Sequence, residues 1–249
     1  IPEPIADLVI NEIDYDQAGT DTAEFVEIYN AGAVAINLDP FSLVGVNGSG
    51  GGAAVYRTVD LPAVSLAAGD YFVVCTNAAT VPFCDLDASP DTDLFQNGAP
   101  DAVALVNGAR VVDTVSYEGN TGAPYTETSG TGLEDGGSGY TGISRYPDGT
   151  DTDVNNVDLS LRCTTPGKAN SSASSSCPNP AAFLAVVINE VDSDTPSTDT
   201  AEFIELYDGG VGNVPLDELV VVLFNGSNDL SYAAYDLDGY TTDASGYFV

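Results

Sequence analysis

The chain has 249 residues, with 38 acidic side chains against 5 basic ones, and it contains no histidine, tryptophan or methionine. This length allows one or two domains with a buried core. The missing histidine excludes Ser–His and Cys–His nucleophiles and histidine-ligated zinc, and the formal net charge of −33 argues against nucleic acid and anionic membrane surfaces as partners.

Short strand-like segments separated by Gly, Asn and Pro follow one another along the chain, and no window keeps a 3.6-residue apolar period. In chain order, the sequence predicts strands at 8–13, 23–29, 41–46, 71–75, 102–106 and 110–117. The pair Asn47-Gly48 is typical of a type I′ hairpin turn, and Asn107-Gly108 joins the last two of these strands. We therefore expect an all-β fold with very little helix, built as a β-sandwich. A run of about 18 apolar residues is missing, so we expect no membrane insertion.

The strand predicted around Glu27 has apolar side chains on both of its faces, which places it inside a sheet. Glu27, and Glu205 at the matching position later in the chain, lie in the middle of such strands and need partners. Basic partners are scarce, because Lys168 and four arginines are the only cationic side chains.

Four cysteines allow three disulfide pairings. Local spacing favours Cys75–Cys84 and Cys163–Cys177. Free thiols and a zinc site are the alternatives, but for zinc the cysteines have no CxxC spacing and there is no histidine to assist them. Disulfides indicate an oxidising, extracellular compartment, so we expect a secreted or cell-surface protein. The chain starts at Ile1 without a visible signal peptide, and we interpret it as a mature or excised segment.

The segment LVINEIDYDQAGTDTAEFVEIYNAG, residues 8–32, returns at 187–210 as VINEVDSDTPSTDTAEFIELYDGG, at a constant offset of 178. A period this long indicates tandem domains rather than a solenoid. We predict a first domain at 1–170, a Ser/Pro-rich linker at 171–182, and a second, truncated domain at 183–249. The second copy reaches only the strand equivalent to 71–74, so we expect it to be completed by other copies of the chain or by neighbouring domains of a longer chain.

Three motifs together resemble the lamin-tail domain of secreted bacterial and archaeal proteins. They are the VINE…EFVEIY start, the VALVN…VVDTVSYEG middle, and the ISRYPDGTDTDVNNVDLSLRCTTPGKAN string at 143–170. The resemblance covers most of 8–170 and, in shortened form, 186–249. It implies tandem immunoglobulin-like β-sandwiches and no catalysis. Such domains commonly accompany nucleases, phosphatases or adhesion modules in secreted prokaryotic proteins.

Acidic clusters are candidates for calcium, which takes six to eight oxygen ligands and needs no His or Cys. The alternative is a set of solvated acidic loops and turn caps. The first cluster recurs in the second repeat with the same spacing, and the other alternates Asp and Asn around one glycine. The candidate ligands are Asp14, Asp16, Asp21 and Glu24; Asp192, Asp194, Asp199 and Glu202; and Asp148, Asp151, Asp153, Asn155 and Asp158.

Enzymatic sites find little support. Asp21 and Asp199 start paired Asp-Thr-Ala triplets, but an aspartic protease uses Asp-Thr-Gly or Asp-Ser-Gly, and no apolar strand precedes Asp21. A two-carboxylate glycosidase has no specific pattern in its favour. Asn47, Asn170 and Asn225 occupy glycosylation sequons, although hairpin turns also explain Asn47 and Asn225.

We therefore predict a non-catalytic extracellular structural or adhesive protein, a surface or filament subunit stabilised by calcium. The alternative is the accessory, binding region of a larger secreted hydrolase such as a nuclease or phosphatase. A carbohydrate-binding module is a third hypothesis. It would need an exposed aromatic platform made from the 13 Tyr and 9 Phe side chains, which the sequence does not locate.

Overall fold

The computed structural model describes residues 7–135, 139–181, 186–194, 201–210, 212–217 and 219–249. The chain divides into two compact units, Ile1–Pro180 (unit 1) and Ala181–Val249 (unit 2). None of the described helices is both long and apolar enough to cross a membrane.

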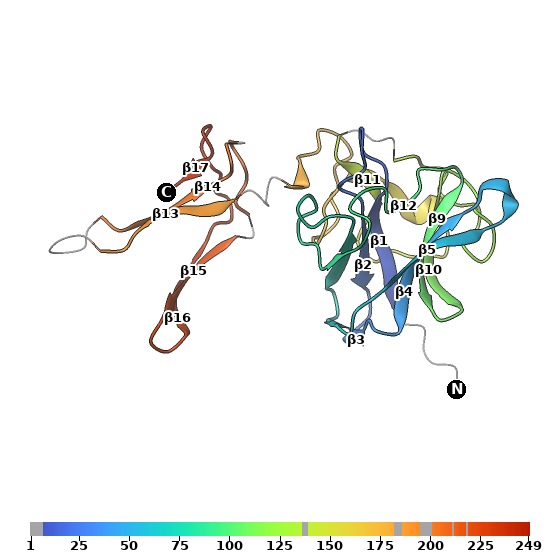
Figure 1. The fold of residues 1–249 in the computed structure, drawn as a ribbon, viewed down its shortest axis with the longest axis horizontal. Helices are drawn as coiled ribbons and strands as arrows, with labels where there is room; N and C mark the ends of the chain where they lie inside the picture. Colours follow the sequence, from blue (N-terminus) through green and yellow to red (C-terminus); the bar gives the residue numbers. More distant parts are fainter. Residues whose placement is uncertain (1–6, 136–138, 182–185, 195–200, 211, 218) are drawn as a thin grey trace. The chain divides into compact units, whose positions relative to one another are not determined.

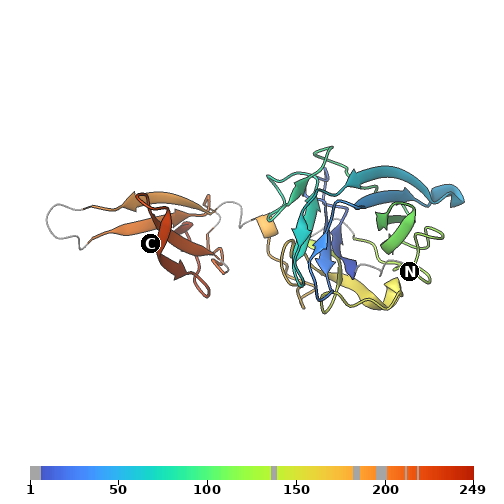
Figure 2. The ribbon, with the colours of Figure 1, turned by 90° about the horizontal axis from the view of Figure 1, so that it is seen from below.

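Unit 1 contains a six-stranded sheet with the strand order β12-β11-β1-β2-β7-β8 (Figures 1 and 2). Its neighbours pair antiparallel, except for the parallel pair of β7 and β8. The strands are β1 (Leu8–Asp14), β2 (Phe25–Asn30), β7 (Tyr71–Cys75), β8 (Leu86–Asp87), β11 (Thr141–Arg145) and β12 (Leu159–Cys163). β2 lies between β1 and β7, which confirms that the strand carrying Glu27 is internal.

A four-stranded sheet with the order β10-β9-β4-β5 forms the second layer of unit 1. It consists of β4 (Phe41–Asn47), β5 (Ala54–Asp60), β9 (Asp101–Asn107) and β10 (Arg110–Tyr117). The smaller elements are the β3 (Ile36–Asn37) and β6 (Ser65–Leu66) pair, the 3₁₀ turn η1 (Ser49–Gly51) and the one-turn helix α1 (Asn155–Asp158). The expected all-β architecture is confirmed.

The core of unit 1 fills the space between its two sheets. Val26 and Ile28 of β2 pack in one cluster with Leu43 of β4, and Val103 and Leu105 of β9. These side chains follow the two-residue period of strands, which sends alternate residues to one face. The apolar alternation of the sequence therefore becomes the inner surface of a sandwich.

The two Asn-Gly pairs have different outcomes. Asn107 pairs with Arg110 across a two-residue turn, where Gly108 adopts a φ of +59° that favours glycine. The type I′ turn predicted at Asn47-Gly48 is wrong, because Gly48 has a φ of −90° and η1 lengthens the loop. The Gly48 N–H instead donates to the Pro100 carbonyl at 3.0 Å, which fastens this loop to the start of β9.

Unit 2 contains a three-stranded sheet, β13-β14-β17, and a two-stranded sheet, β15-β16. Its strands are β13 (Val187–Asp192), β14 (Phe203–Tyr207), β15 (Val220–Asn225), β16 (Leu230–Asp236) and β17 (Tyr247–Phe248). Leu206, Leu216 and Leu237 form its small buried cluster.

Candidate metal sites and the buried carboxylate network

Two glutamates face each other across β1 and β2, and both are fully buried. Glu12 pairs with Glu27 in the strand register. Residues 164–170, which we call the closing loop, contact both glutamates. Gly167 N–H donates to Glu27 Oε2 at 2.7 Å, and Thr165 N–H donates to Glu12 Oε2 at 3.0 Å. The partner that Glu27 needs is therefore a backbone amide rather than a basic side chain.

The remaining carboxylate oxygens of this pair are also bonded. Asn11 Nδ2 donates to Glu27 Oε1 at 2.8 Å, and Ser144 Oγ donates to Glu12 Oε1 at 3.0 Å. Burial raises the pKa of Glu12 to about 8. Burial, followed by the neighbouring charge of Glu12, also raises the pKa of Glu27 well above its ordinary value. Both side chains are thus held by hydrogen bonds in an environment that disfavours their charge.

Asn170 ends the closing loop and is almost fully buried. Its Nδ2 donates to the Asn11 carbonyl at 3.1 Å and to the Arg145 carbonyl at 2.7 Å. Asp148 Oδ1 accepts from Asn170 N–H at 2.9 Å, and Asp148 Oδ2 accepts from the Tyr71 hydroxyl at 2.8 Å. Because both amide protons of Asn170 are used inside the fold, this sequon has no free nitrogen for a glycan in the folded unit.

Arg145 is the centre of a second buried network. Its Nη2 contacts the two Asp113 carboxylate oxygens at 3.0 and 3.1 Å, and its Nη1 contacts Asp151 Oδ1 at 3.2 Å. Asp158 Oδ2 lies 3.7 Å from Nη1. The Arg145 side chain has no exposed surface. A buried guanidinium needs this many acceptors, since an unpaired buried charge is strongly destabilising.

Asp113, Glu127 and Asp151 bring carboxylate oxygens within 4.8 Å of one another, close enough to share a metal ion. Burial, then the charge of Asp113, raises the pKa of Glu127 to about 9. Asn155 Nδ2 donates to Glu127 Oε2 at 2.6 Å. Arg145 already supplies a cation to two of these acids, so the guanidinium and a Glu127 proton together perform the charge balance that a metal would provide.

The predicted ligands around 148–158 have several different protein partners, although Asp151 and Asp158 both lie beside Arg145 Nη1. Asp148 binds the closing loop, and Asp151 binds Arg145. Asp158 accepts from the backbone N–H groups of Thr152 and Val154. Two further members complete the set: Asn155 bonds to Ser116 N–H and the Thr114 carbonyl, and the exposed Asp153 donates its N–H to Asp151.

The predicted set around 14–24 is also divided. Glu24 is buried and accepts from Leu94 N–H at 2.5 Å and Phe95 N–H at 3.0 Å. Asp21 Oδ2 and Asp16 Oδ1 both accept from Asn97 Nδ2, at 2.8 and 3.1 Å. Glu24 therefore holds the loop after β8 in place. Asp14 has a different neighbour.

That neighbour is Asp135, which sequence reasoning missed. The residue is 3% exposed, and its Oδ2 accepts from Tyr15 N–H at 3.0 Å. Its Oδ1 has no hydrogen-bond partner of normal geometry among the described residues, although the carboxyl of Asp14 and the backbone N–H of Asp16 both lie close to the Asp135 carboxyl. Burial raises the pKa of Asp135 to about 7, and burial with the Asp135 charge raises that of Asp14. Two adjacent acids in this setting share either a proton or a cation.

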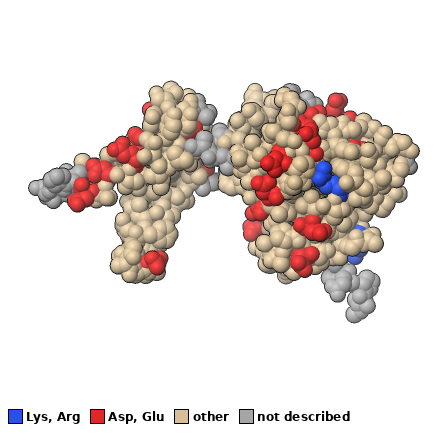
Figure 3. Space-filling model, viewed as in Figure 1, with Lys and Arg blue, Asp and Glu red and all other residues tan. Residues whose placement is uncertain are grey.

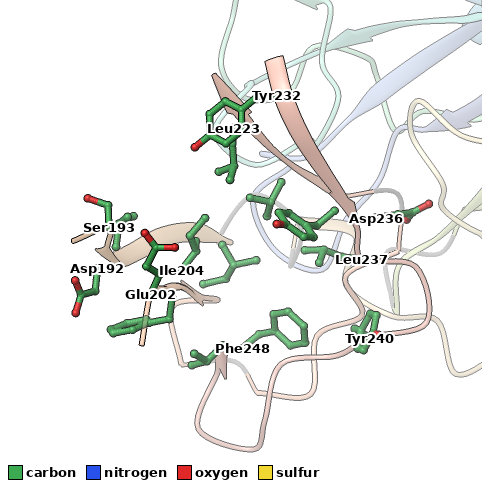
Figure 4. A pocket seen from close by; sticks show the side chains of 16 residues that line it. Asp192, Ser193, Glu202, Ile204, Leu223, Tyr232, Asp236, Leu237, Tyr240 and Phe248 are labelled. Atoms are coloured by element: carbon green, nitrogen blue, oxygen red, sulfur yellow. The ribbon is translucent and has the colours of Figure 1, made fainter. Parts of the chain in front are cut away.

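In unit 2, Asp199 lies outside the described residues. Asp194 is exposed and donates its N–H to Asp192 Oδ1 at 3.4 Å. Asp192 and Glu202 lie along one side of a hollow in this unit (Figure 4). Acidic side chains also spread over the face on view in Figure 3, with few basic ones between them.

Both predicted disulfides are present, Cys75–Cys84 and Cys163–Cys177. The first joins the end of β7 to the following loop, and the second joins the end of β12 to the Ser-rich stretch behind it. Two disulfides, with no free cysteine in the described chain, are typical of an oxidising environment.

Residues 2–119 match the sequence model of the Lamin Tail Domain family, an immunoglobulin-like domain without enzymatic activity. The match runs from before β1 to just past β10. Arg145 and the closing loop follow the matched residues in the chain. The fold of unit 1 therefore extends beyond the match, and the added segment holds Glu12 and Glu27. No curated protein matches the chain.

Proposed function

We propose that the chain is a non-catalytic extracellular module with a structural or adhesive role, a subunit of a surface layer or filament. One observation carries this proposal: the acidic side chains of the VINE and EFVEIY motifs accept hydrogen bonds that hold the fold together. Glu12 and Glu27 hold the amides of Thr165 and Gly167, and Glu24 holds those of Leu94 and Phe95. Carboxylates fixed by backbone amides lock distant chain segments together, and their buried oxygens are not free to contact a substrate.

Two further features support an extracellular setting. The disulfides anchor both the loop after β7 and the stretch after β12. The formal charge of −33 keeps such a protein soluble, but self-repulsion weakens its compact state at low ionic strength. A divalent cation counteracts that repulsion.

Calcium binding at Asp14 and Asp135 forms the second part of the proposal. Calcium prefers carboxylate oxygens. Asp135 Oδ1 is buried without a hydrogen-bond partner of normal geometry among the described residues, and Asp14 is beside it. Asp16, which the sequence placed in the same cluster, adds its charge to Asp135. Glu24, Asp148, Asp151 and Asp158 of the predicted sets already accept hydrogen bonds from the protein, which favours this pair over them as a cation site.

Surface labelling tests the proposed role. Antibodies against unit 1 are applied to intact cells that make the protein, and the protein released from those cells is assayed for phosphodiester and phosphomonoester hydrolysis. The proposal predicts labelling without permeabilisation, and no turnover by the chain itself. Labelling only after permeabilisation would contradict the extracellular role. Turnover by the 249-residue chain that is lost in Glu27→Gln would favour a catalytic function.

A further inference from the structure

The closing loop lies inside a covalent ring. The Cys163–Cys177 disulfide joins two residues that are 14 positions apart, and residues 164–170 fall between them. Cys163 ends β12 and pairs with Thr141 of β11, so one end of the ring is part of the six-stranded sheet. The other end follows a stretch that contains only Ser and Ala. The disulfide therefore fixes both ends of the segment that holds the two buried glutamates.

Polar bonds, rather than apolar packing, hold the closing loop on the sheet. The N–H groups of Thr165 and Gly167 donate to the glutamates, and the Asn170 side chain donates to two backbone carbonyls. Within 164–170, all of which the structure describes, Pro166 is the one apolar side chain that is buried. Because water replaces such bonds once a loop lifts, they add little net free energy to the closed state.

The stretch that follows the closing loop also lacks an apolar anchor. None of residues 171–176, a fully described range, is buried. The stretch is tied to β12, the edge strand of its sheet, by backbone carbonyls. The Ala173 carbonyl accepts from Cys163 N–H at 2.8 Å, and the Ser172 carbonyl accepts from Arg162 Nη1 at 3.1 Å. The disulfide is therefore the strongest tie that this stretch has to the sheet.

The other disulfide provides a contrast. The loop that Cys75–Cys84 closes carries Val81, which is buried in an apolar cluster with side chains of β2 and β7. This loop therefore has an anchor of its own in the fold. Its Phe83 lies beside Gly167, so it touches the closing loop from outside, but it does not join the two ends of that loop.

We propose that the Cys163–Cys177 disulfide is a redox latch on the closing loop. While the bond is intact, the short ring keeps the amides of Thr165 and Gly167 on the two glutamates, because a cross-link limits the conformations open to the segment that it encloses. When the bond is reduced, the closing loop and the stretch behind it lift from the sheet and open the glutamates to water. This device goes beyond the structural or adhesive role and does not depend on it.

The redox step is a thiol–disulfide exchange. To close the latch, the two thiols pass two electrons and two protons to the disulfide of a protein oxidant, which leaves as a dithiol. To open it, a dithiol reductant attacks one sulfur, forms a mixed disulfide, and departs as its own disulfide, which leaves Cys163 and Cys177 as thiols. Reducing compartments keep such thiols reduced and oxidising ones let the bond form. Unit 1 therefore reaches its closed state only in an oxidising compartment.

Hydrogen exchange in the full chain tests the latch directly. The amides of Thr165 and Gly167 report on the closing loop, and the amide of Leu105, in an inner strand of the other sheet, reports on global unfolding. Cys163→Ser/Cys177→Ser should speed exchange of both closing-loop amides at least roughly tenfold relative to Leu105, because local opening exposes only the amides of the part that opens.

Cys75→Ser/Cys84→Ser is the matched control. It also removes one disulfide, but it should leave the ratio of closing-loop to Leu105 exchange within about twofold of the unchanged chain. In this control chain Cys163–Cys177 is the remaining disulfide. Adding dithiothreitol to it should therefore reproduce the faster closing-loop exchange, and reoxidation should reverse it.

Linkage supplies a second measurement that keeps all four cysteines. If the disulfide favours the closed loop, the bonds of the closed loop favour the disulfide by the same factor. Glu27→Ala removes the acceptor of Gly167 N–H. It should therefore make Cys163–Cys177 about fivefold or more easier to reduce in a glutathione buffer. Glu205→Ala, the matched position in unit 2, should leave that equilibrium unchanged. This measurement decides the matter even where a cysteine variant does not fold.

Three results would overturn the proposal. The first is closing-loop exchange that stays unchanged relative to Leu105 when the Cys163–Cys177 bond is removed or reduced. The second is an equal acceleration in both double cysteine variants, which would mean that either disulfide stabilises the whole unit and neither acts on the closing loop. The third is the same glutathione equilibrium for Cys163–Cys177 in Glu27→Ala and Glu205→Ala, which would mean that the disulfide and the closing loop are independent.

Discussion

Gly167 donates its backbone N–H to Glu27 Oε2 at 2.7 Å, although 140 positions separate the two residues in the chain. Glu27 lies in the middle of an inner strand, where a carboxylate without a partner would be strongly destabilising. The closing loop supplies this partner with the backbone N–H of Gly167, and the N–H of Thr165 does the same for Glu12. The contact explains why a chain with few cations can bury two facing glutamates.

Replacing Gly167 with alanine should destabilise unit 1. Its φ is +75°, and an added Cβ would lie 2.5 Å from the Cβ of Phe83. Gly108→Ala is the matched control, because Gly108 also has a positive φ but has open space around it. Strain alone costs on the order of 1 kcal/mol. Denaturant unfolding should show a clearly larger loss for Gly167→Ala than for Gly108→Ala, and equal losses would contradict the packing of the closing loop on Phe83.

Arg145→Met should be among the most damaging single substitutions, costing about 3–5 kcal/mol, because it leaves several buried carboxylates without their cation. The double variant Arg145→Met/Asp113→Asn should recover part of the loss. Arg110→Met, at an exposed site, should change stability by about 0.5 kcal/mol or less. If the two single variants unfold at the same urea concentration, the Arg145 network does not contribute as described.

Stability should fall as the pH rises from 5 to 9. The pKa values of Glu12 and Glu24 rise to about 8 in the fold, and that of Glu127 rises to about 9. The ordinary glutamate value is 4.5, so the folded chain holds these protons more tightly than the unfolded chain. Their contribution is complete below pH 4.5 and is lost as the pH passes through 8 and 9, which lowers the melting temperature.

Glu127→Gln should reduce this pH dependence. The amide can still accept from Asn155 and donate to Asp113, but it cannot ionise. Melting curves at pH 5, 7 and 9 should show a smaller drop for Glu127→Gln than for the exposed control Glu134→Gln. The same drop in both variants would show that Glu127 does not hold a proton in the fold.

Calcium should raise the melting temperature at fixed ionic strength, because a ligand that binds only the folded state adds about 2.7 kcal/mol at a hundredfold excess over its Kd. Asp135→Asn should abolish this gain, whereas the exposed control Asp39→Asn should keep it. Identical melting temperatures in EDTA and in millimolar calcium would contradict calcium binding by the folded chain. A rise in melting temperature that survives Asp135→Asn would show that calcium binds at another site.

The strands and the disulfides could be predicted because their signals are local. Alternating apolar residues define β2 and β9, and short loops connect Cys75 to Cys84 and Cys163 to Cys177. The turn at Asn47-Gly48 differs from the type I′ prediction because its geometry depends on Pro100, which is distant in sequence.

The carboxylate partners could not be predicted for the same reason. Asp113 looks like an isolated acid in an apolar strand, Asp135 like part of a glycine-rich loop, and Glu127 like a surface residue. Each acquires its role only when β10, β11 and the connecting loop meet β1. Residue type indicated that acids would cluster, but folding determines which acid meets Arg145 and which meets a backbone amide.

Hydrogen exchange at the Gly167 amide, in Glu27→Ala against Glu205→Ala, tests most directly whether the motif glutamates serve the fold. Glu205 is the matched position in unit 2 and contacts no closing loop in the described chain. A buried amide that loses its acceptor costs about 1–3 kcal/mol. We therefore predict that Glu27→Ala speeds Gly167 exchange at least roughly tenfold, while Glu205→Ala leaves it unchanged. Unaltered Gly167 exchange in Glu27→Ala would contradict the account.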